Sequence, residues 1–88
     1  MDQQQLRDKL VQLHDELERT DTVDENTRRV LADLRKDIQD LLDRPAEDID
    51  HRGVSRRLRA DLTKFESTHP RLTAAMERAI DALVQMGV

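Results

Sequence analysis

Apolar residues recur at intervals of three and four positions along most of the chain, which is the spacing of one face of an α-helix. The first such stripe lies within residues 2–19 and consists of Leu6, Leu10, Leu13 and Leu17. The polar residues between these leucines fall on the other faces of the same helix. The pattern therefore predicts an amphipathic first helix over residues 2–19, with one face that another element must cover.

A second apolar stripe follows the interruption at Thr20-Asp21-Thr22. It consists of Thr27, Leu31, Leu34, Ile38 and Leu41, widened by Val30 and Leu42. Thr22 and Glu25 have the spacing of a capping box, in which a hydroxyl and a carboxylate satisfy each other's backbone N–H groups. Pro45 disfavours helical geometry in the residue before it. We therefore expect a second helix that begins at Thr22 and ends before Pro45.

The short connection between these two helices predicts an antiparallel hairpin. With the turn centred near Thr20 and Asp21, the expected pairs across the hairpin are Leu17 with Val23, Leu13 with Thr27, Leu10 with Leu31, and Leu6 with Leu34. In this register Ile38, Leu41 and Leu42 extend past the start of the first helix. We therefore expect some other part of the fold, or another molecule, to cover this apolar overhang.

Residues 44–53 have the composition of a linker, because they contain Pro45, Gly53 and an acidic run. The helical spacing returns in residues 54–88, first with Val54, Leu58, Leu62 and Phe65, and then with Leu72, Met76, Ala79, Ile80 and Leu83. These two groups of apolar residues are separated by Ser67-Thr68-His69-Pro70. The C-terminal segment is therefore expected to contain either two helices or one.

Pro70 decides between these alternatives. If His69 is the N-cap and Pro70 the first helical residue, two helices form a second hairpin with Phe65 near Leu72 and Leu58 near Ile80. Otherwise one long helix runs through the segment with a kink at Pro70. We favour the break, because a proline inside a helix costs about 3 kcal/mol and the residues before it supply capping groups.

The predicted fold class is all-α, with one helical domain over residues 1–88. It comprises an N-terminal hairpin (1–43), a linker (44–53) and a C-terminal helical segment (54–88), arranged as a bundle or as a coiled-coil-like oligomer. A chain of 88 residues buries only about 60% of the surface that its unfolded form exposes. There is no Trp or Tyr, and Phe65 is the one Phe, so the core must be thin and rich in leucine.

Charge is distributed unevenly along the chain, which carries −4 in total. Residues 1–50 hold fifteen acidic and eight basic residues, whereas residues 51–88 hold four acidic and seven basic residues. This asymmetry suggests attraction within the fold or between subunits. The start Met1-Asp2-Gln3 lacks the features of a signal peptide, and no stretch reaches the ~20 apolar residues that span a bilayer, so we expect a cytoplasmic protein without membrane contact.

The segment Asp48-Ile49-Asp50-His51-Arg52-Gly53 resembles the start of an EF-hand calcium loop. Arg52 occupies the fifth position of that loop and Arg59 the twelfth, where the loop requires a bidentate Glu. Two cations thus replace two ligands. We expect no calcium site, no transition-metal site at Asp48, Asp50 and His51, and no cofactor; the absence of cysteine also excludes disulfides and thiolate ligands.

His14 and His69 are the other candidates for acid–base chemistry. His14 precedes Glu18 by one helical turn, which predicts an ordinary surface pair. His69 falls on the apolar stripe before Pro70, where a capping or structural role is expected. There is no glycine-rich phosphate loop, and the chain has only two glycines. We therefore expect that the protein is not an enzyme.

Four arginines form the strongest charged feature of the sequence: Arg52, Arg56, Arg57 and Arg59. If the third helix begins early, Arg52, Arg56 and Arg59 share one face, and guanidinium groups bind phosphates well. Alternatively, these arginines pair with Asp40, Asp43, Glu47 or Asp48 within the fold or across a dimer. We favour pairing over nucleic-acid binding, because no aromatic residues lie between the arginines and the chain is acidic overall.

The apolar overhang of the second helix is the feature from which we predict function. The candidate interface consists of Ile38, Leu41, Leu42, Leu58, Leu62 and Phe65. These residues can close within one chain or between chains, and the thin core favours a homodimer. The leading hypothesis is a non-enzymatic interaction or scaffold module that self-associates through leucine faces and has an unidentified protein partner. The alternative is nucleic-acid or polyanion binding through the four arginines.

Four segments together give the chain a family resemblance. They are the Leu6-Leu10-Leu13-Leu17 opening, Asp37-Ile38-Gln39, His69-Pro70-Arg71-Leu72, and the ending from Asp81-Ala82-Leu83 to Met86-Gly87-Val88. With these helix-packing patterns the chain resembles a family of short bacterial proteins known only as a domain of unknown function. The resemblance implies an all-helical bacterial protein without an assigned activity, cofactor or site, so no functional residue is carried over.

Overall fold

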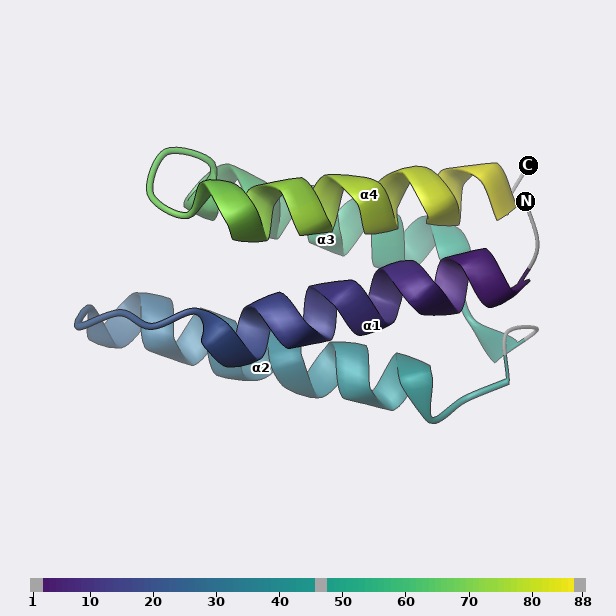
Figure 1. The fold of residues 1–88 in the computed structure, drawn as a ribbon, viewed down its shortest axis with the longest axis horizontal. Coiled ribbons are helices and arrows are strands. Elements are labelled where there is room, and N and C mark those ends of the chain that lie inside the picture. The colour runs from purple at the N-terminus through teal and green to yellow at the C-terminus, as the bar shows by residue number, and fades with distance from the viewer. Residues whose placement is uncertain (1–2, 46–47, 87–88) are drawn as a thin grey trace.

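The computed structural model describes residues 3–45 and 48–86, and in these ranges it contains four α-helices and no strand (Figure 1). The helices are α1 (Gln3–Arg19), α2 (Glu25–Leu42), α3 (His51–Phe65) and α4 (Pro70–Met86). They run alternately up and down and form a bundle of about 37 × 22 × 19 Å. The all-α prediction with two antiparallel hairpins is therefore confirmed.

Helices α1 and α4 are the central neighbours in the bundle. The closest backbone approaches are between α3 and α4, between α1 and α4, and between α1 and α2. Helices α2 and α3 lie further apart, and the side chains of Ile38 and Leu58 help to line the seam between them. The small residues Ala75, Ala79 and Ala82 are buried on α4, which allows neighbouring helices to approach it closely.

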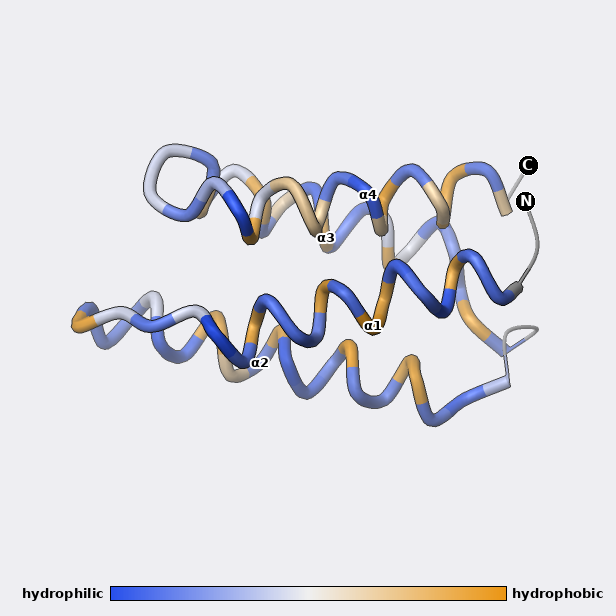
Figure 2. Tube along the Cα trace, in the orientation of Figure 1, coloured by the Kyte–Doolittle hydropathy of each residue, from blue (hydrophilic) through white to orange (hydrophobic). Residues whose placement is uncertain are grey.

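The core follows the apolar stripes of the sequence. Hydrophobic positions recur at regular intervals along each helix in Figure 2. All four leucines of the first stripe are buried, and α4 is the most apolar helix. Each leucine that is removed from water contributes about 1.5–3 kcal/mol relative to an exposed one. The core is thus built mainly of leucine, as the composition predicts.

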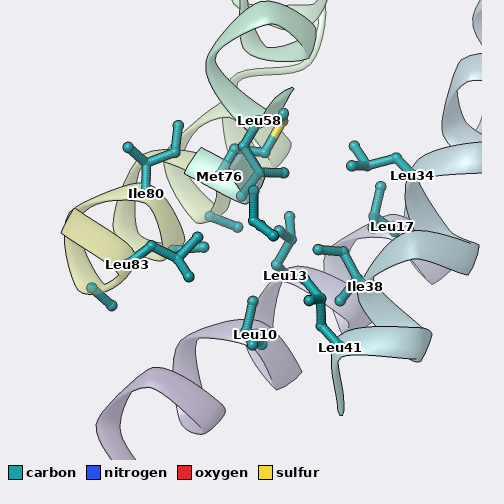
Figure 3. Close-up of a cluster of buried hydrophobic side chains, with 14 of the residues drawn as sticks. Leu10, Leu13, Leu17, Leu34, Ile38, Leu41, Leu58, Met76, Ile80 and Leu83 are labelled. Atoms are coloured by element: carbon teal, nitrogen blue, oxygen red, sulfur yellow. The ribbon is translucent and has the colours of Figure 1, made fainter. Parts of the chain in front are cut away.

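The first hairpin has a different register from the predicted one. Nη1 of Arg7 donates a hydrogen bond to the carbonyl oxygen of Leu42 at 2.9 Å, and Nη1 of Arg35 lies 3.5 Å from Oε2 of Glu18. Figure 3 accordingly shows Leu17 beside Leu34, Leu13 beside Ile38, and Leu10 beside Leu41. The predicted pairs are therefore wrong by about three helical turns, and α1 itself covers Ile38 and Leu41.

The start of α2 explains this difference. Helix α2 begins at Glu25 with Asp24 as its N-cap, so the predicted start at Thr22 and the predicted capping box are wrong. The hydroxyl of Thr22 instead accepts a hydrogen bond from the backbone N–H of Asp24 at 3.2 Å. The connection runs on past the end of α1 before α2 turns back (Figure 1). As a result Val23, the predicted partner of Leu17, is 99% exposed.

The predicted break at Pro70 is confirmed. Helix α3 ends at Phe65, and Pro70 is the first residue of α4, where its missing N–H costs nothing. The carbonyl oxygen of His69 accepts hydrogen bonds from the backbone N–H of Thr73 at 2.9 Å and from its hydroxyl at 3.0 Å. The imidazole of His69 also contacts the edge of the Phe65 ring, with 5.7 Å between centroids. His69 therefore links the two helices of the second hairpin.

Helix α3 begins at His51, three residues before the predicted start of the C-terminal helical segment at Val54. Asp50 is its N-cap, and Oδ1 of this residue accepts a hydrogen bond from the backbone N–H of Gly53 at 3.1 Å. Carboxylates stabilise the first turn of a helix because unsatisfied N–H groups point towards them. The early start brings Arg52 into the same helix as Arg56 and Arg59.

Candidate anion-binding surface on helix α3

The six residues of the predicted leucine interface lie inside the single chain. Ile38, Leu41, Leu58 and Phe65 are buried, and Leu42 and Leu62 pack partly buried against the same core. Figure 3 shows Ile38, Leu41 and Leu58 among side chains from the other helices. Four of the six are therefore enclosed within one chain, whereas Leu42 and Leu62 keep part of their surface exposed, and self-association through leucine faces stays a prediction.

The histidines and carboxylates do not form a metal-binding cluster in the described ranges. Nε2 of His14 lies 3.8 Å from Oε1 of Glu18, as expected for a surface pair on α1. Among residues 3–45 and 48–86, no three His, Asp or Glu side chains are placed so that they could hold a metal ion. Asp50 instead caps α3, and Asp48 is exposed.

No helix in these ranges has the length and apolar character needed to cross a membrane.

Helix α3 carries the four predicted arginines, and the structure divides them between two faces. Arg57 faces α2, where its Nη1 lies 3.6 Å from Oδ2 of Asp37. This carboxylate was not among the predicted partners Asp40, Asp43, Glu47 and Asp48, and of these Glu47 lies outside the described residues. An exposed ion pair of this kind contributes only about 0–1 kcal/mol. Arg57 therefore has a structural partner within the bundle.

Arg52, Arg56 and Arg59 lie on one face of α3, as their four-and-three spacing requires. All three are exposed, and together they border an open hollow of about 520 Å³ between α3 and α4. No Asp or Glu in the described part of the chain lies within ion-pair distance of these guanidinium groups. We call these three residues the arginine face.

The hollow beside the arginine face has an apolar floor. Leu83 and Val84 of α4 line it; Val84 is 41% exposed, whereas Leu83 is fully buried beneath it, so Val84 supplies the accessible apolar surface. Ser55 also lines the hollow, with its hydroxyl donating to the carbonyl oxygen of Arg52 at 3.1 Å. Nε2 of His51 is buried and has no hydrogen-bond partner in the described residues, although its ring borders the same hollow. The site thus combines cationic donors with a small apolar surface.

The side chains of this site are chemically suited to bind anions. Each guanidinium group offers five N–H donors in a planar fork that matches a carboxylate or a phosphate. Arg52 and Arg59 are separated by about 10 Å along the helix axis at ~1.5 Å per residue. Arg56 also borders a neighbouring hollow that contains Asp40, Asp48 and Asp50. The positive surface is therefore short and has acidic groups on one side.

Sequence reasoning identified the arginines but missed the rest of the hollow. Ser55 lies on the same helical face as Arg52 and Arg59, so its spacing could have indicated it. The predicted second hairpin places Leu58 opposite Ile80. Extending this register by one helical turn towards the start of α3 would have indicated that Leu83 and Val84 lie near the arginine face. His51 has no comparable signal, because it joins this face only through the early start of α3.

The sequence matches the model of a known protein family over most of its length. No curated protein and no solved structure matches the chain. The model of the family described as Domain of unknown function (DUF4404) matches residues 6–88, which is nearly the whole chain. The protein therefore belongs to the DUF4404 family.

Proposed function

We propose that this protein is a non-enzymatic binding module whose arginine face recognises an anionic partner. The observation that supports this proposal is the absence of a carboxylate within ion-pair distance of the arginine face among the described residues. The chain contains nineteen acidic and fifteen basic residues, so internal partners are abundant. Three arginines that stay unpaired on one helical face in such a chain are available to a partner from outside.

The energetics of α3 favour an external anion. Like charges spaced by three or four positions on a helix destabilise it by a few tenths of a kcal/mol per pair. An anion bound across Arg52, Arg56 and Arg59 would remove this repulsion and form charge-assisted hydrogen bonds. A group that enters the hollow could also give the buried Nε2 of His51 a hydrogen-bond partner, since leaving such an atom unpaired costs about 1–3 kcal/mol.

The leucine faces support a scaffold role less well than the arginine face supports anion recognition. Their side chains form the core that holds α1 to α4 together. Offering them to a second copy would require the bundle to open. The arginine face, in contrast, is exposed on the folded chain and needs no rearrangement.

Titration with inorganic tripolyphosphate, a compact polyanion, tests this proposal. We expect changes in the NMR spectrum of the ¹⁵N-labelled protein to concentrate on the Nε–H groups of the arginine face and on the backbone of its helix. The triple variant Arg52→Gln, Arg56→Gln, Arg59→Gln should bind about tenfold or more weakly, and rising salt should weaken binding by the native chain. The matched control is Arg57→Gln, whose side chain already pairs with Asp37.

Two results would contradict the proposal. The first is binding that spreads evenly over all basic residues, including Arg71 and Arg78 on α4. The second is an equal loss of affinity in the Arg57→Gln control and in the triple variant. Circular dichroism of each variant checks that the bundle still folds.

A further inference from the structure

One turn of the chain has the properties that a partner of the arginine face needs. Three large hydrophobic residues are exposed in the described ranges, namely Val11, Val23 and Val84, and Val23 is the most exposed at 99%. Val23 lies in the turn between α1 and α2, next to Asp24 and close to Asp21 and Glu25. We call these four residues, Asp21, Val23, Asp24 and Glu25, the acidic tip.

Local hydrogen bonds hold the acidic tip in a defined shape. Oδ1 of Asp21 accepts from the backbone N–H of Thr22 at 2.8 Å, and Oδ2 of Asp24 accepts from the hydroxyl of Thr27 at 2.6 Å. Nη2 of Arg28 donates to the carbonyl oxygen of Thr22 at 3.1 Å. A turn fixed in this way loses little conformational freedom when it binds, which favours its use as a recognition element.

We infer that the anionic partner of the arginine face is the acidic tip of a second copy of this chain. This inference rests on the proposed function and names its partner. The acidic tip places an apolar side chain, Val23, beside the carboxylates of Asp21 and Asp24, which have no ion-pair partner among the described residues, whereas Glu25 pairs with Arg28 at 3.8 Å. The hollow places the exposed side chain of Val84 beside guanidinium groups. The two surfaces are therefore complementary both in charge and in the position of their apolar groups.

The two surfaces cannot meet within one molecule. Figure 1 shows the turn between α1 and α2 at one end of the bundle and the start of α3, with the end of α4, towards the other. The long axis of the molecule measures 37 Å. When two copies lie side by side with their axes antiparallel, the acidic tip of each copy lies level with the arginine face of the other. Two such contacts related by a two-fold axis would close the dimer.

A nucleic acid fits the arginine face less well than this protein segment. The one aromatic residue, Phe65, is buried and cannot stack on a base. Asp40, Asp48 and Asp50 border the hollow next to Arg56 together with Arg44 and Arg57, so the positive surface does not continue there as an unbroken track for an extended polyanion. The short positive surface and its apolar floor instead match a short acidic segment with one exposed aliphatic side chain.

Charge reversal on each surface tests the inference. The tip variant is Asp21→Lys, Glu25→Lys, and the face variant is Arg56→Glu, Arg59→Glu. In sedimentation velocity over a concentration series, we expect the native chain to shift from monomer to dimer with a Kd between about 1 µM and 1 mM. Each variant alone should stay monomeric, because both contacts then bring like charges together.

A mixture of the two variants should recover the dimer. In the mixed dimer one contact joins a lysine tip to a glutamate face, and the other joins two native surfaces, so both contacts are attractive. Val23→Ser should weaken the native dimer about tenfold or more, since it removes the apolar group. The matched control is Val11→Ser, another exposed valine, which lies on α1 and should leave the Kd unchanged.

Several outcomes would overturn this inference. A native chain that stays monomeric at about 1 mM would exclude the second copy as the partner. If tripolyphosphate still bound at the arginine face, the proposed function would stand and only its partner would be wrong. Failure of the mixed variants to associate would also contradict it. So would binding of a single-stranded oligonucleotide that is abolished by Arg56→Glu and unchanged in the tip variant.

Discussion

Nη1 of Arg35 on α2 lies 3.5 Å from Oε2 of Glu18 on α1. Glu18 is close to the end of α1, whereas Arg35 comes ten residues after the start of α2 at Glu25. The first turns of α2 therefore extend beyond the end of α1. This offset carries the connecting turn away from the bundle and leaves Val23 uncovered. The ion pair between Arg35 and Glu18 thus marks a single hairpin register, which both closes the core and exposes the acidic tip.

The leucines of α1 are expected to dominate the stability of the bundle. Leu13 is fully buried and lies beside Ile38 at the centre of the core (Figure 3). Leu13→Ala should lower the free energy of unfolding by about 2–5 kcal/mol, because it removes buried methyl groups and leaves a cavity. Urea denaturation measures this change. Val11→Ala on the exposed side of the same helix is the control and should change stability by less than about 1 kcal/mol; equal effects would contradict the core described above.

The N-cap of α3 predicts an unusual response to a glycine substitution. A Cβ atom at Gly53 would overlap the carboxylate of Asp50, which caps this helix. Gly53→Ala should therefore lose the cap, worth about 0.5–2 kcal/mol, while gaining about 1 kcal/mol of helix propensity. The two effects nearly cancel in the native background.

A double-mutant cycle separates these two effects. Once Asp50→Ala has removed the cap, Gly53→Ala should stabilise the chain by about 1 kcal/mol, as it does in an ordinary helix interior. Thermal or urea denaturation of the four proteins gives the coupling. Equal effects of Gly53→Ala in both backgrounds would show that the cap is not displaced.

The turn before α2 predicts a specific pH dependence. The hydroxyl of Thr27, which donates to Oδ2 of Asp24 at 2.6 Å, holds the pKa of Asp24 below its ordinary value of 3.8. Because the folded-state pKa is lowered, the stabilisation is complete above the pKa of the unfolded chain. It is lost as the pH falls through the folded-state pKa, that is, below about pH 4.

Thr27→Val removes the donor and should raise the pKa of Asp24 towards the ordinary value. NMR titration of the Asp24 carboxyl group measures this shift. Thr63→Val is a suitable control, because the hydroxyl of Thr63 donates to a backbone carbonyl on α3 rather than to a carboxylate. An unchanged Asp24 pKa in Thr27→Val would contradict the hydrogen bond as its cause.

The helices could be predicted from the sequence because their signals are local. Leu6, Leu10, Leu13 and Leu17 define one face whatever the rest of the chain does. The break at Pro70 could be predicted for the same reason, since the proline ring and its missing N–H act within one turn. Local signals of this kind account for the fold class and for the second hairpin.

The register of the first hairpin could not be predicted, because two residues compete to cap α2. Thr22 and Asp24 both have side chains suited to an N-cap, and the choice between them sets the length of the connection. The different surroundings of Arg57 and of the arginine face likewise depend on how the helices pack together, which the local sequence does not reveal. Arg57 pairs with Asp37 only because α2 lies on that side of α3, and the apolar floor of the hollow comes from α4.

Leu41 provides the sharpest test of whether the leucine stripe of α2 is core or interface. Its side chain is 6% exposed and lies beside Leu10 (Figure 3). Leu41→Asp would place a carboxylate among apolar groups without a partner, which typically costs more than about 4 kcal/mol and approaches the total stability of a small domain. We therefore expect the variant to lose most of its helical circular dichroism at 25 °C. If Leu41 instead formed an interface between two folded chains, the variant would keep its helical signal and sediment as a folded monomer, and the core assignment would be wrong.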